Sequence, residues 1–267
     1  MKKVIYLTVL SVLLMLPNFA LFAADLTGRE IMELVQNRNT GDNVTLNMKM
    51  ELISNNGDKR IRQIHSFSKE FGEDTYRLIF FESPADVRNT GFLTYDYDQD
   101  DKDDDQYMFL PALKKTKRIA GSDKSGSFMG SDMNYSDMTK PDLDDYNYKY
   151  LKEANVRGSK CWIVIVEPKN KDVEEESGYS KRAVWVTQDS HLMIRSKSWV
   201  SGKKEVKFFE FYDPIKIDNV WFIQKVQVKR KLGEKTLHST ALSYNNIKLN
   251  QNLNEDLFTR RRLEKGL

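Results

Sequence analysis

The sequence predicts a mainly β (α+β) protein built on one large antiparallel sheet. Short segments in which apolar and polar residues alternate recur along most of the chain, as expected for strands with one buried and one wet face. Gly, Asn, Asp, Ser and Pro residues separate these segments, and helical periodicity is confined to the start, an insertion in mid-chain and the end. A sheet with this many strands must curl or close to bury its apolar face.

Composition narrows the class of protein. The chain has 267 residues, enough for one large β domain or two small ones with a sizeable core. The formal net charge of +3 is small beside 42 basic and 39 acidic residues, so charge indicates neither nucleic acid nor an anionic membrane surface as a partner. Cys161 is the one cysteine of the sequence, which excludes a disulfide within the chain. We interpret it as a small buried residue of a strand, the alternatives being a nucleophile or an intermolecular bridge.

Residues 1–24 have the pattern of a secretory signal peptide. Two lysines precede an apolar run over residues 4–16, and small residues surround Ala23 and Ala24, where we expect cleavage. The match to the A-x-A cleavage pattern is imperfect, so an uncleaved anchor is the alternative. No later apolar run is long enough to span a bilayer.

The mature chain is predicted to open with a helix over residues 28–37. Thr27 and Glu30 have the spacing of a capping box, and apolar residues follow at helical intervals. The period then changes to 2 over residues 44–52, which predicts a strand. The Asn-Asn-Gly-Asp sequence at 55–58 predicts a hairpin turn, so this strand and the next are expected to be antiparallel neighbours.

The remaining strands are expected in two groups around the insertion. They are predicted at residues 61–68, 75–82, 91–97 and 106–110 before it, and at residues 146–152, 161–167, 181–187, 192–200, 204–212, 220–229 and 235–247 after it. A last helical turn is predicted at Glu255–Phe258, with Arg260–Arg262 exposed beyond it. The acidic run at 98–105 is interpreted as a solvated hairpin tip. Calcium binding is the alternative, although the run lacks the Gly and distal Glu of an EF-hand loop.

The insertion, at about residues 111–140, follows neither periodicity. It begins with a basic cluster, continues through Gly and Ser residues and ends in an acidic segment. An insertion of this length between strands is a lid, a binding loop or a disordered segment, and its Phe and Met residues argue against disorder. Arg118, Asp132 and Asp137 could form an ion-pair network that ties it to the sheet. Alternatively, Arg118 could contact a lipid phosphate.

Two motifs in this region carry a family resemblance. The runs YMFLPALKKTKRI and SFMGSDMNYSDM, within Tyr107–Met138, resemble the signature of the outer-membrane lipoprotein-sorting family related to the LolA and LolB carriers. The resemblance implies a single domain over residues 25–267, in which an open, strongly curved half-barrel has helices over its mouth and encloses an apolar cavity for acyl chains. This sequence departs from the dedicated carriers in its longer acidic hairpin and its Lys-rich motif, so a lipid is as plausible a cargo as a lipoprotein.

Methionine and aromatic residues are the candidates for the lining of such a cavity, because a flexible thioether adapts to irregular chains. For each of them the alternative is ordinary core packing. The candidates for the cavity or its lid are Met48, Met50, Phe80, Phe109, Arg118, Phe128, Met129, Met133, Trp185, Met193 and Trp221. We expect no cofactor and no metal.

The function expected from the sequence is that of a periplasmic carrier for lipid or lipoprotein acyl chains between the inner and outer membranes. An inner-membrane transporter or an outer-membrane acceptor is the expected partner. A periplasmic adaptor of a lipid exporter, without cargo of its own, is the main alternative. A lipid hydrolase is less well supported, because His65, His191 and His238 lie in no recognisable catalytic motif and G-x-S-x-G is absent. We therefore expect a protein that is not an enzyme.

Overall fold

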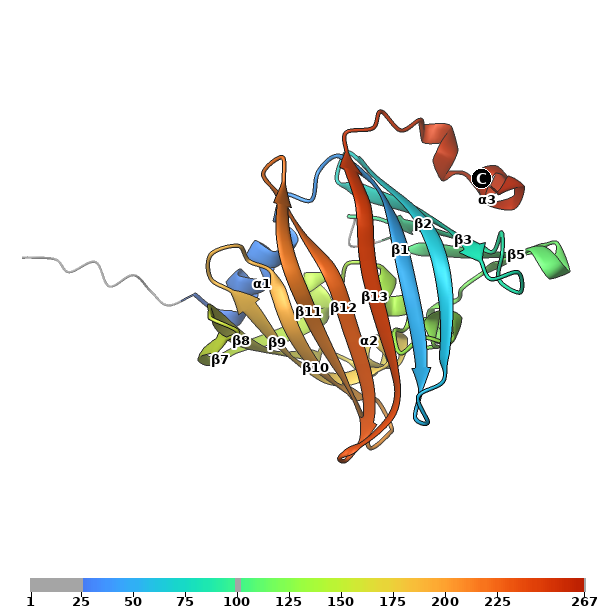
Figure 1. Cartoon of the computed structure of the whole chain (residues 1–267). Helices are drawn as coiled ribbons and strands as arrows, with labels where there is room; N and C mark the ends of the chain where they lie inside the picture. The colour runs from blue at the N-terminus through green and yellow to red at the C-terminus, as the bar shows by residue number, and fades with distance from the viewer. Residues whose placement is uncertain (1–25, 99–101, 267) are drawn as a thin grey trace, which may run out of the picture.

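The computed structural model describes residues 26–98 and 102–266, and within them the strands form one 13-stranded antiparallel sheet. The strand order is β6-β5-β4-β3-β2-β1-β13-β12-β11-β10-β9-β8-β7. Figure 1 shows the sheet curved into an open half-barrel, which confirms the predicted fold class. The predicted signal peptide lies outside the described residues. Within the part of the chain that the structure describes, no helix has the length and apolar character needed to cross a bilayer.

The elements have the following bounds. The strands are β1 Asn43–Ser54, β2 Lys59–Phe71, β3 Asp74–Ser83, β4 Gly91–Asp96, β5 Asp105–Leu110, β6 Lys115–Arg118, β7 Tyr146–Val156, β8 Ser159–Pro168, β9 Tyr179–Thr187, β10 Met193–Val200, β11 Glu205–Ile217, β12 Val220–Leu232 and β13 Lys235–Leu249. The helices are α1 Gly28–Gln36, α2 Lys171–Ser177 and α3 Arg260–Lys265. Single 3-10 turns are η1 Pro111–Leu113, η2 Gly121–Asp123, η3 Phe128–Gly130, η4 Tyr135–Met138, η5 Leu143–Asp145 and η6 Glu255–Phe258.

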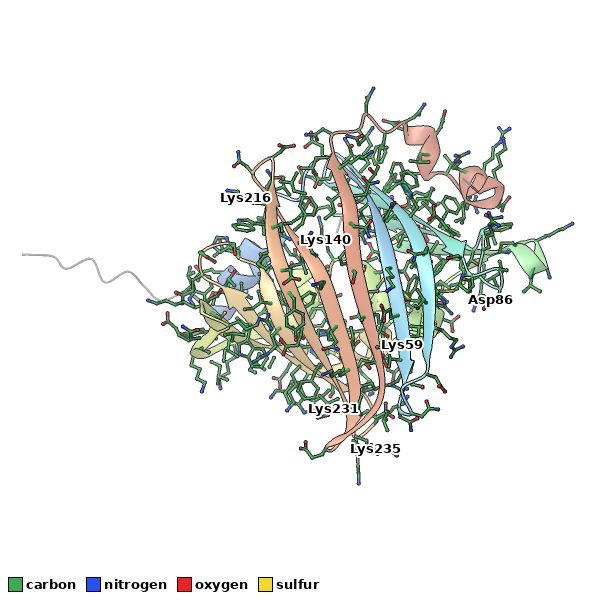
Figure 2. The ribbon with its side chains drawn as sticks, in the orientation of Figure 1. Lys59, Asp86, Lys140, Lys216, Lys231 and Lys235 are labelled. Atoms are coloured by element: carbon green, nitrogen blue, oxygen red, sulfur yellow. The ribbon has the colours of Figure 1, made fainter. Side chains whose placement is uncertain are left out.

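Most connections in the sheet are hairpins between strands that are neighbours in the sequence. The predicted turn joins β1 and β2, and Gly57 supplies its positive φ of 93°. In Figure 2 the labelled Lys231 and Lys235 mark the tip of the β12–β13 hairpin, where Leu232 pairs with Lys235. β1 also pairs with β13, which joins the two groups of strands into one sheet.

Helix α1 begins at the predicted capping box. The Thr27 hydroxyl accepts a hydrogen bond from the Glu30 amide, and the Glu30 carboxylate accepts one from the Thr27 amide. Ile31 and Met32 are buried against valines of β8 and β9, such as Val184. The helix therefore covers one end of the sheet.

Three parts of the predicted element list need correction. The basic cluster is not part of an irregular loop, because Lys115–Arg118 forms the edge strand β6, in which Arg118 pairs with Tyr107 of β5. The acidic stretch before β9 forms the short helix α2, capped by Asn170 and ended by Gly178. The chain beyond η6 forms the helix α3, which was not predicted: Arg260 and Arg261 are exposed as expected, whereas Arg262 is partly buried and Leu263 is completely buried.

The two faces of the sheet are covered by different segments. The C-terminal segment packs Phe258 and Leu263 on Phe80 and Leu93 at one face. On the other face, which is concave, the insertion packs Phe128 against Phe92, with ring centroids 5.1 Å apart. Figure 1 shows the part of the insertion that follows β6, in green, in the hollow behind β12, β13 and β1, with α3 outside the hollow.

Candidate ligand cavity

A cavity of about 220 Å³ lies between the concave face and the insertion. Strands β1, β2, β3 and β13 supply its floor, and the η3–η4 region of the insertion supplies its roof. The lining is mainly aliphatic and thioether side chains. Its residues are Leu46, Met48, Met50, Ile64, Ser66, Arg77, Ile79, Phe128, Met133, Asp137, Met138, Leu242 and Tyr244.

Few polar side chains reach this cavity. Arg77 of β3 donates a hydrogen bond of 2.5 Å from Nη1 to the Met138 carbonyl of the roof. Tyr244 of β13 lines the opposite part of the floor, and burial raises the pKa of its hydroxyl to about 12. Asp137 lines the roof, but its carboxylate is already bound to other protein groups.

The insertion is fixed to the sheet by two buried aspartates. The Asp132 carboxylate, 1% exposed, accepts hydrogen bonds from Arg230 Nε at 3.3 Å and from the Thr240 hydroxyl at 2.8 Å, and lies 2.7 Å from His238 Nδ1. The Thr240 hydroxyl donates to Asp132 and not to His238, so this trio lacks the nucleophile-to-base hydrogen bond of a hydrolase triad.

Asp137 is the second attachment point. Its carboxylate accepts hydrogen bonds of 2.8 Å from Arg182 Nη2, from the Tyr179 hydroxyl and from the Asn134 amide. Burial and the adjacent Asp137 raise the pKa of Tyr179 well above its usual value, so the phenol remains a donor. Charge-assisted bonds of this kind are stronger than neutral ones, so the insertion is held firmly at this point.

Further bonds run from strand side chains to the insertion. Arg62 Nη1 donates to the Met129 carbonyl, and Gln106 Nε2 donates to the Tyr135 carbonyl. Buried Lys207 donates to Asn134 Oδ1 at 2.7 Å, and desolvation lowers the pKa of this lysine to about 8. The roof of the cavity is therefore bonded to the sheet over its whole length.

The exit of the insertion is held by the β4–β5 hairpin. Asp96 accepts a hydrogen bond of 3.0 Å from the Lys140 amide, and burial raises the pKa of this carboxyl. Burial likewise raises the pKa of Asp104 to about 6, and the nearby Asp96 adds to the effect.

Part of the acidic run, residues 99–101, is outside the described residues. Elsewhere in residues 26–98 and 102–266, no three His, Cys, Asp or Glu side chains converge as metal ligands would.

Comparison with known proteins places this architecture in a family. A family model described as "uncharacterized protein" matches residues 73–265. The crystal structure of a DUF1329 family protein from Desulfovibrio piger is 30% identical, with a TM-score of 0.80, over 88% of this chain and 97% of that one. The chain belongs to the DUF1329 family.

Two further structures are similar to this DUF1329 protein. A domain from Vibrio parahaemolyticus, described as outer membrane lipoprotein-sorting, is 27% identical, with a TM-score of 0.79 over 89% of this chain and 98% of that one. A LolA superfamily protein from Nitrosomonas europaea shares the fold at 16% identity, with a TM-score of 0.66 over 89% and 99% of the two chains. The predicted family resemblance is thus confirmed. No curated protein matches this sequence significantly.

The structure of this DUF1329 protein brings some of the predicted site residues together. Met48, Met50, Phe128 and Met133 all line the cavity. Met129 packs on the same core and is not among the lining residues. The roles of these five residues in ligand binding stay predictions.

Other predicted residues lie elsewhere, and they are removed from the candidate lining. Phe80 and Phe109 point to the opposite face, under the C-terminal segment, because they alternate with the inward residues of β3 and β5. Trp185 and Trp221 border a separate cluster around buried Cys161, consistent with the interpretation of that cysteine as a core residue.

Met193 and Arg118 also lie away from the cavity. Met193 packs against the cluster under α1. Arg118 is 58% exposed and pairs with Asp105 at 2.6 Å, so it is not part of the expected network with Asp132 and Asp137. The network exists, but its cations are Arg182 and Arg230 from distant strands.

Sequence reasoning missed Arg77 and Tyr244 as cavity residues. A signal was present for Arg77, since it has the same parity in β3 as the inward-facing Ile79 and Phe81. A charged residue at an inward position of a strand is unusual, and this feature indicates a candidate cavity residue. Tyr244 likewise has the same parity in β13 as the inward-facing Leu242.

Proposed function

We propose that this protein is a periplasmic carrier that binds the acyl chain of a lipid or lipoprotein in the cavity and moves it between the inner and outer membranes. The observation that carries the proposal is the largely apolar cavity between the concave face and the insertion. The 27% identity to a domain described as outer membrane lipoprotein-sorting supports it. The partners proposed are an inner-membrane transporter and an outer-membrane acceptor.

The lining suits hydrocarbon. Met48, Met50, Met133 and Met138 supply four thioether side chains, which are flexible enough to follow chains of different shape. Burial of hydrocarbon provides about 0.8 kcal/mol per methylene, so affinity would grow with the length of chain enclosed. Binding and release then need no covalent step.

The size of the cavity constrains how cargo enters. A volume of about 220 Å³ lies below the range of roughly 300–1,000 Å³ typical of small-molecule sites. A bulky cargo therefore requires the roof to move. We propose that residues 111–140, together with α1, act as the lid, and that opening breaks the bonds of Asp132 and Asp137 to the sheet.

A substitution that fills the cavity tests the proposal. Met133→Trp places a bulky ring in the cavity from the roof, whereas Met193→Trp makes the same chemical change in the cluster under α1. Each variant would be purified gently from the periplasm and examined by native mass spectrometry for bound lipid, with thermal unfolding as the control for folding. We expect the wild type and Met193→Trp to retain lipid and Met133→Trp to lose most of it.

Two outcomes would contradict the carrier function. Wild-type protein that carries no lipid and takes none up from vesicles would favour an adaptor without cargo. Equal lipid occupancy in a folded Met133→Trp variant would show that the hydrocarbon lies elsewhere.

A further inference from the structure

We infer that the cavity is selective for a single-chain lipid with an anionic head, whose head is bound by Arg77 and Tyr244. The inference rests on the proposed carrier function and specifies its ligand class. It depends on the few polar groups of the lining and on the limited volume of the closed cavity.

Arg77 is the cationic side chain of the lining. A guanidinium has five N–H donors, and the Met138 carbonyl accepts from Nη1 alone. Among the described residues, no carboxylate oxygen lies within 4.0 Å of the Arg77 guanidinium, the limit for an ion pair. The carboxylate of the nearby Asp96 accepts a hydrogen bond from the Lys140 amide. Donors of Arg77 are therefore available to a ligand carboxylate or phosphate, which a guanidinium can bind through two bonds.

The other charged residue of the lining, Asp137, is not an ion-pair partner of Arg77. Asp137 accepts from three donors, and its charge is compensated by Arg182 at 2.8 Å. Arg77 is thus the charged group of the lining that lacks an ion-pair partner within 4.0 Å, and its electrostatic attraction to Asp96 acts over a longer distance. A neutral or cationic head would leave this charge unpaired, at an energetic cost, when the cavity fills with hydrocarbon.

Tyr244 supplies a second donor. Within residues 26–98 and 102–266 its hydroxyl has no hydrogen-bond partner, although the side chain lines the cavity. The Tyr244 side chain is partly buried, and its hydroxyl is available to donate to a ligand oxygen. Arg77 also acts on Tyr244 electrostatically, lowering the pKa of its hydroxyl against the larger effect of burial.

The apolar part begins next to this pair. Tyr244 is opposite Met48 in the β1–β13 ladder, and the next inward pair is Leu242 and Met50. The lining therefore changes from polar to aliphatic within one pair of residues, as a head joined directly to a chain requires. With the roof closed, the volume of about 220 Å³ suits one chain and not the several chains of a lipoprotein anchor.

Three probes separate the contribution of the head from that of the chain. Decanoate, decyl phosphate and methyl decanoate carry similar chains with a carboxylate, a phosphate or an uncharged ester. Calorimetric titration of the full protein, stripped of lipid, would give the dissociation constant of each. We expect the better of the two anions to bind at least about tenfold more tightly than the ester, because a charged hydrogen bond contributes about 1.5–3 kcal/mol. The tighter anion identifies the head as carboxylate or phosphate.

Arginine variants supply a matched control. Arg77→Met and Arg62→Met each remove one bond of 2.5 Å to a backbone carbonyl of the insertion, but Arg62 is not among the lining residues. We expect Arg77→Met to abolish the preference for anions and Arg62→Met to keep it. Tyr244→Phe should reduce the preference a few-fold, the effect of one hydrogen bond.

Three results distinguish the possible failures. Equal binding of ester and anions by the wild type would overturn the head-group inference and leave the carrier function intact. Equal loss of preference in Arg62→Met and Arg77→Met would also overturn it, since anchoring of the insertion would then explain the effect. Failure of every probe to bind, together with absence of co-purified lipid, would instead reject the carrier function itself.

Discussion

At the scale of single residues, the buried acids of the insertion are the sharpest feature of the molecule. Asp132 is 1% exposed and has Arg230, His238 and Thr240 around it. Removal of one member of a buried pair leaves the remaining charge without compensation, which costs more than the pair contributes. The stability of the insertion should therefore be sensitive to this one carboxylate.

Asp132→Asn tests that sensitivity. We expect a loss of about 2–3 kcal/mol in the free energy of unfolding, below the 3–5 kcal/mol of a fully buried pair because Arg230 is partly exposed. Asp123→Asn is the control, since Asp123 pairs with Lys117 on the surface and should cost less than about 1 kcal/mol. Urea unfolding of both variants measures the difference, and equal costs would show that the Asp132 cluster does not hold the insertion.

Lys207 makes stability depend on pH. Burial lowers its folded pKa to about 8, below the usual 10.5, so between these values the unfolded chain binds more protons than the folded one. Stability from this group must rise with pH there, by about 2 kcal/mol between pH 7 and 9.5. We expect unfolding free energies of Lys207→Met to lack this rise. An unchanged slope would show that Lys207 is not desolvated.

Some residues predicted to line the cavity lie away from it, for a physical reason. The alternation of Phe80 with Ile79 and Phe81 was visible, but alternation fixes only which residues share a face. Which of the two faces is concave depends on the curvature of the whole sheet. The partner of Asp137, Arg182, is 45 residues away in sequence, so no local signal connects the two.

At the scale of elements, the insertion expected at about residues 111–140 contains a strand, β6, that was not predicted. Lys115–Arg118 contains no apolar residue, so no alternation of apolar and polar residues marked this strand in the sequence. The helices α2 and α3 are too short for a hydrophobic period to emerge, so capping residues, such as Asn170 and Gly178 of α2, were the available signals. In contrast, α1 was predicted within one residue at its end, because its capping box and apolar spacing agree.

Helix α3 should contribute to stability and not to ligand binding. Leu263 is completely buried against Phe80 and Gly91, where a Cβ on Gly91 would lie 2.5 Å from Leu263 Cδ1. We expect Leu263→Ala to cost about 2–5 kcal/mol, as for other buried leucines. Leu113→Ala, at a site 62% exposed, should change stability by less than about 0.5 kcal/mol.

The same variant separates the two faces of the sheet. Leu263 lies opposite the cavity, so decanoate should bind to folded Leu263→Ala with wild-type affinity. Thermal unfolding gives the stability and calorimetry the affinity. A large loss of affinity in the folded variant would contradict a structural role confined to the other face.

At the scale of the whole molecule, an open sheet must protect two edges. Unpaired backbone groups at an edge strand can pair with another chain. The β7 edge is approached by α1, and a Cβ on Gly28 would lie 2.8 Å from the Tyr150 amide nitrogen. The β6 edge consists of the sequence Lys-Thr-Lys-Arg, in which the basic residues are exposed. Helix and charge thus provide different protection at the two edges.

The charged edge leads to a prediction about association. The double variant Lys115→Val, Lys117→Val removes two positive charges from β6 and adds residues that favour strands. We expect it to associate edge to edge as concentration rises, which sedimentation velocity would detect relative to the wild type.

The control is the double variant Lys225→Val, Lys229→Val, which makes the same changes on β12, where both backbone edges are paired. It is closely matched, since Lys225 pairs with Asp213 as Lys117 does with Asp123. Association of both double variants to the same extent would show that lost charge, and not an unprotected edge, is responsible.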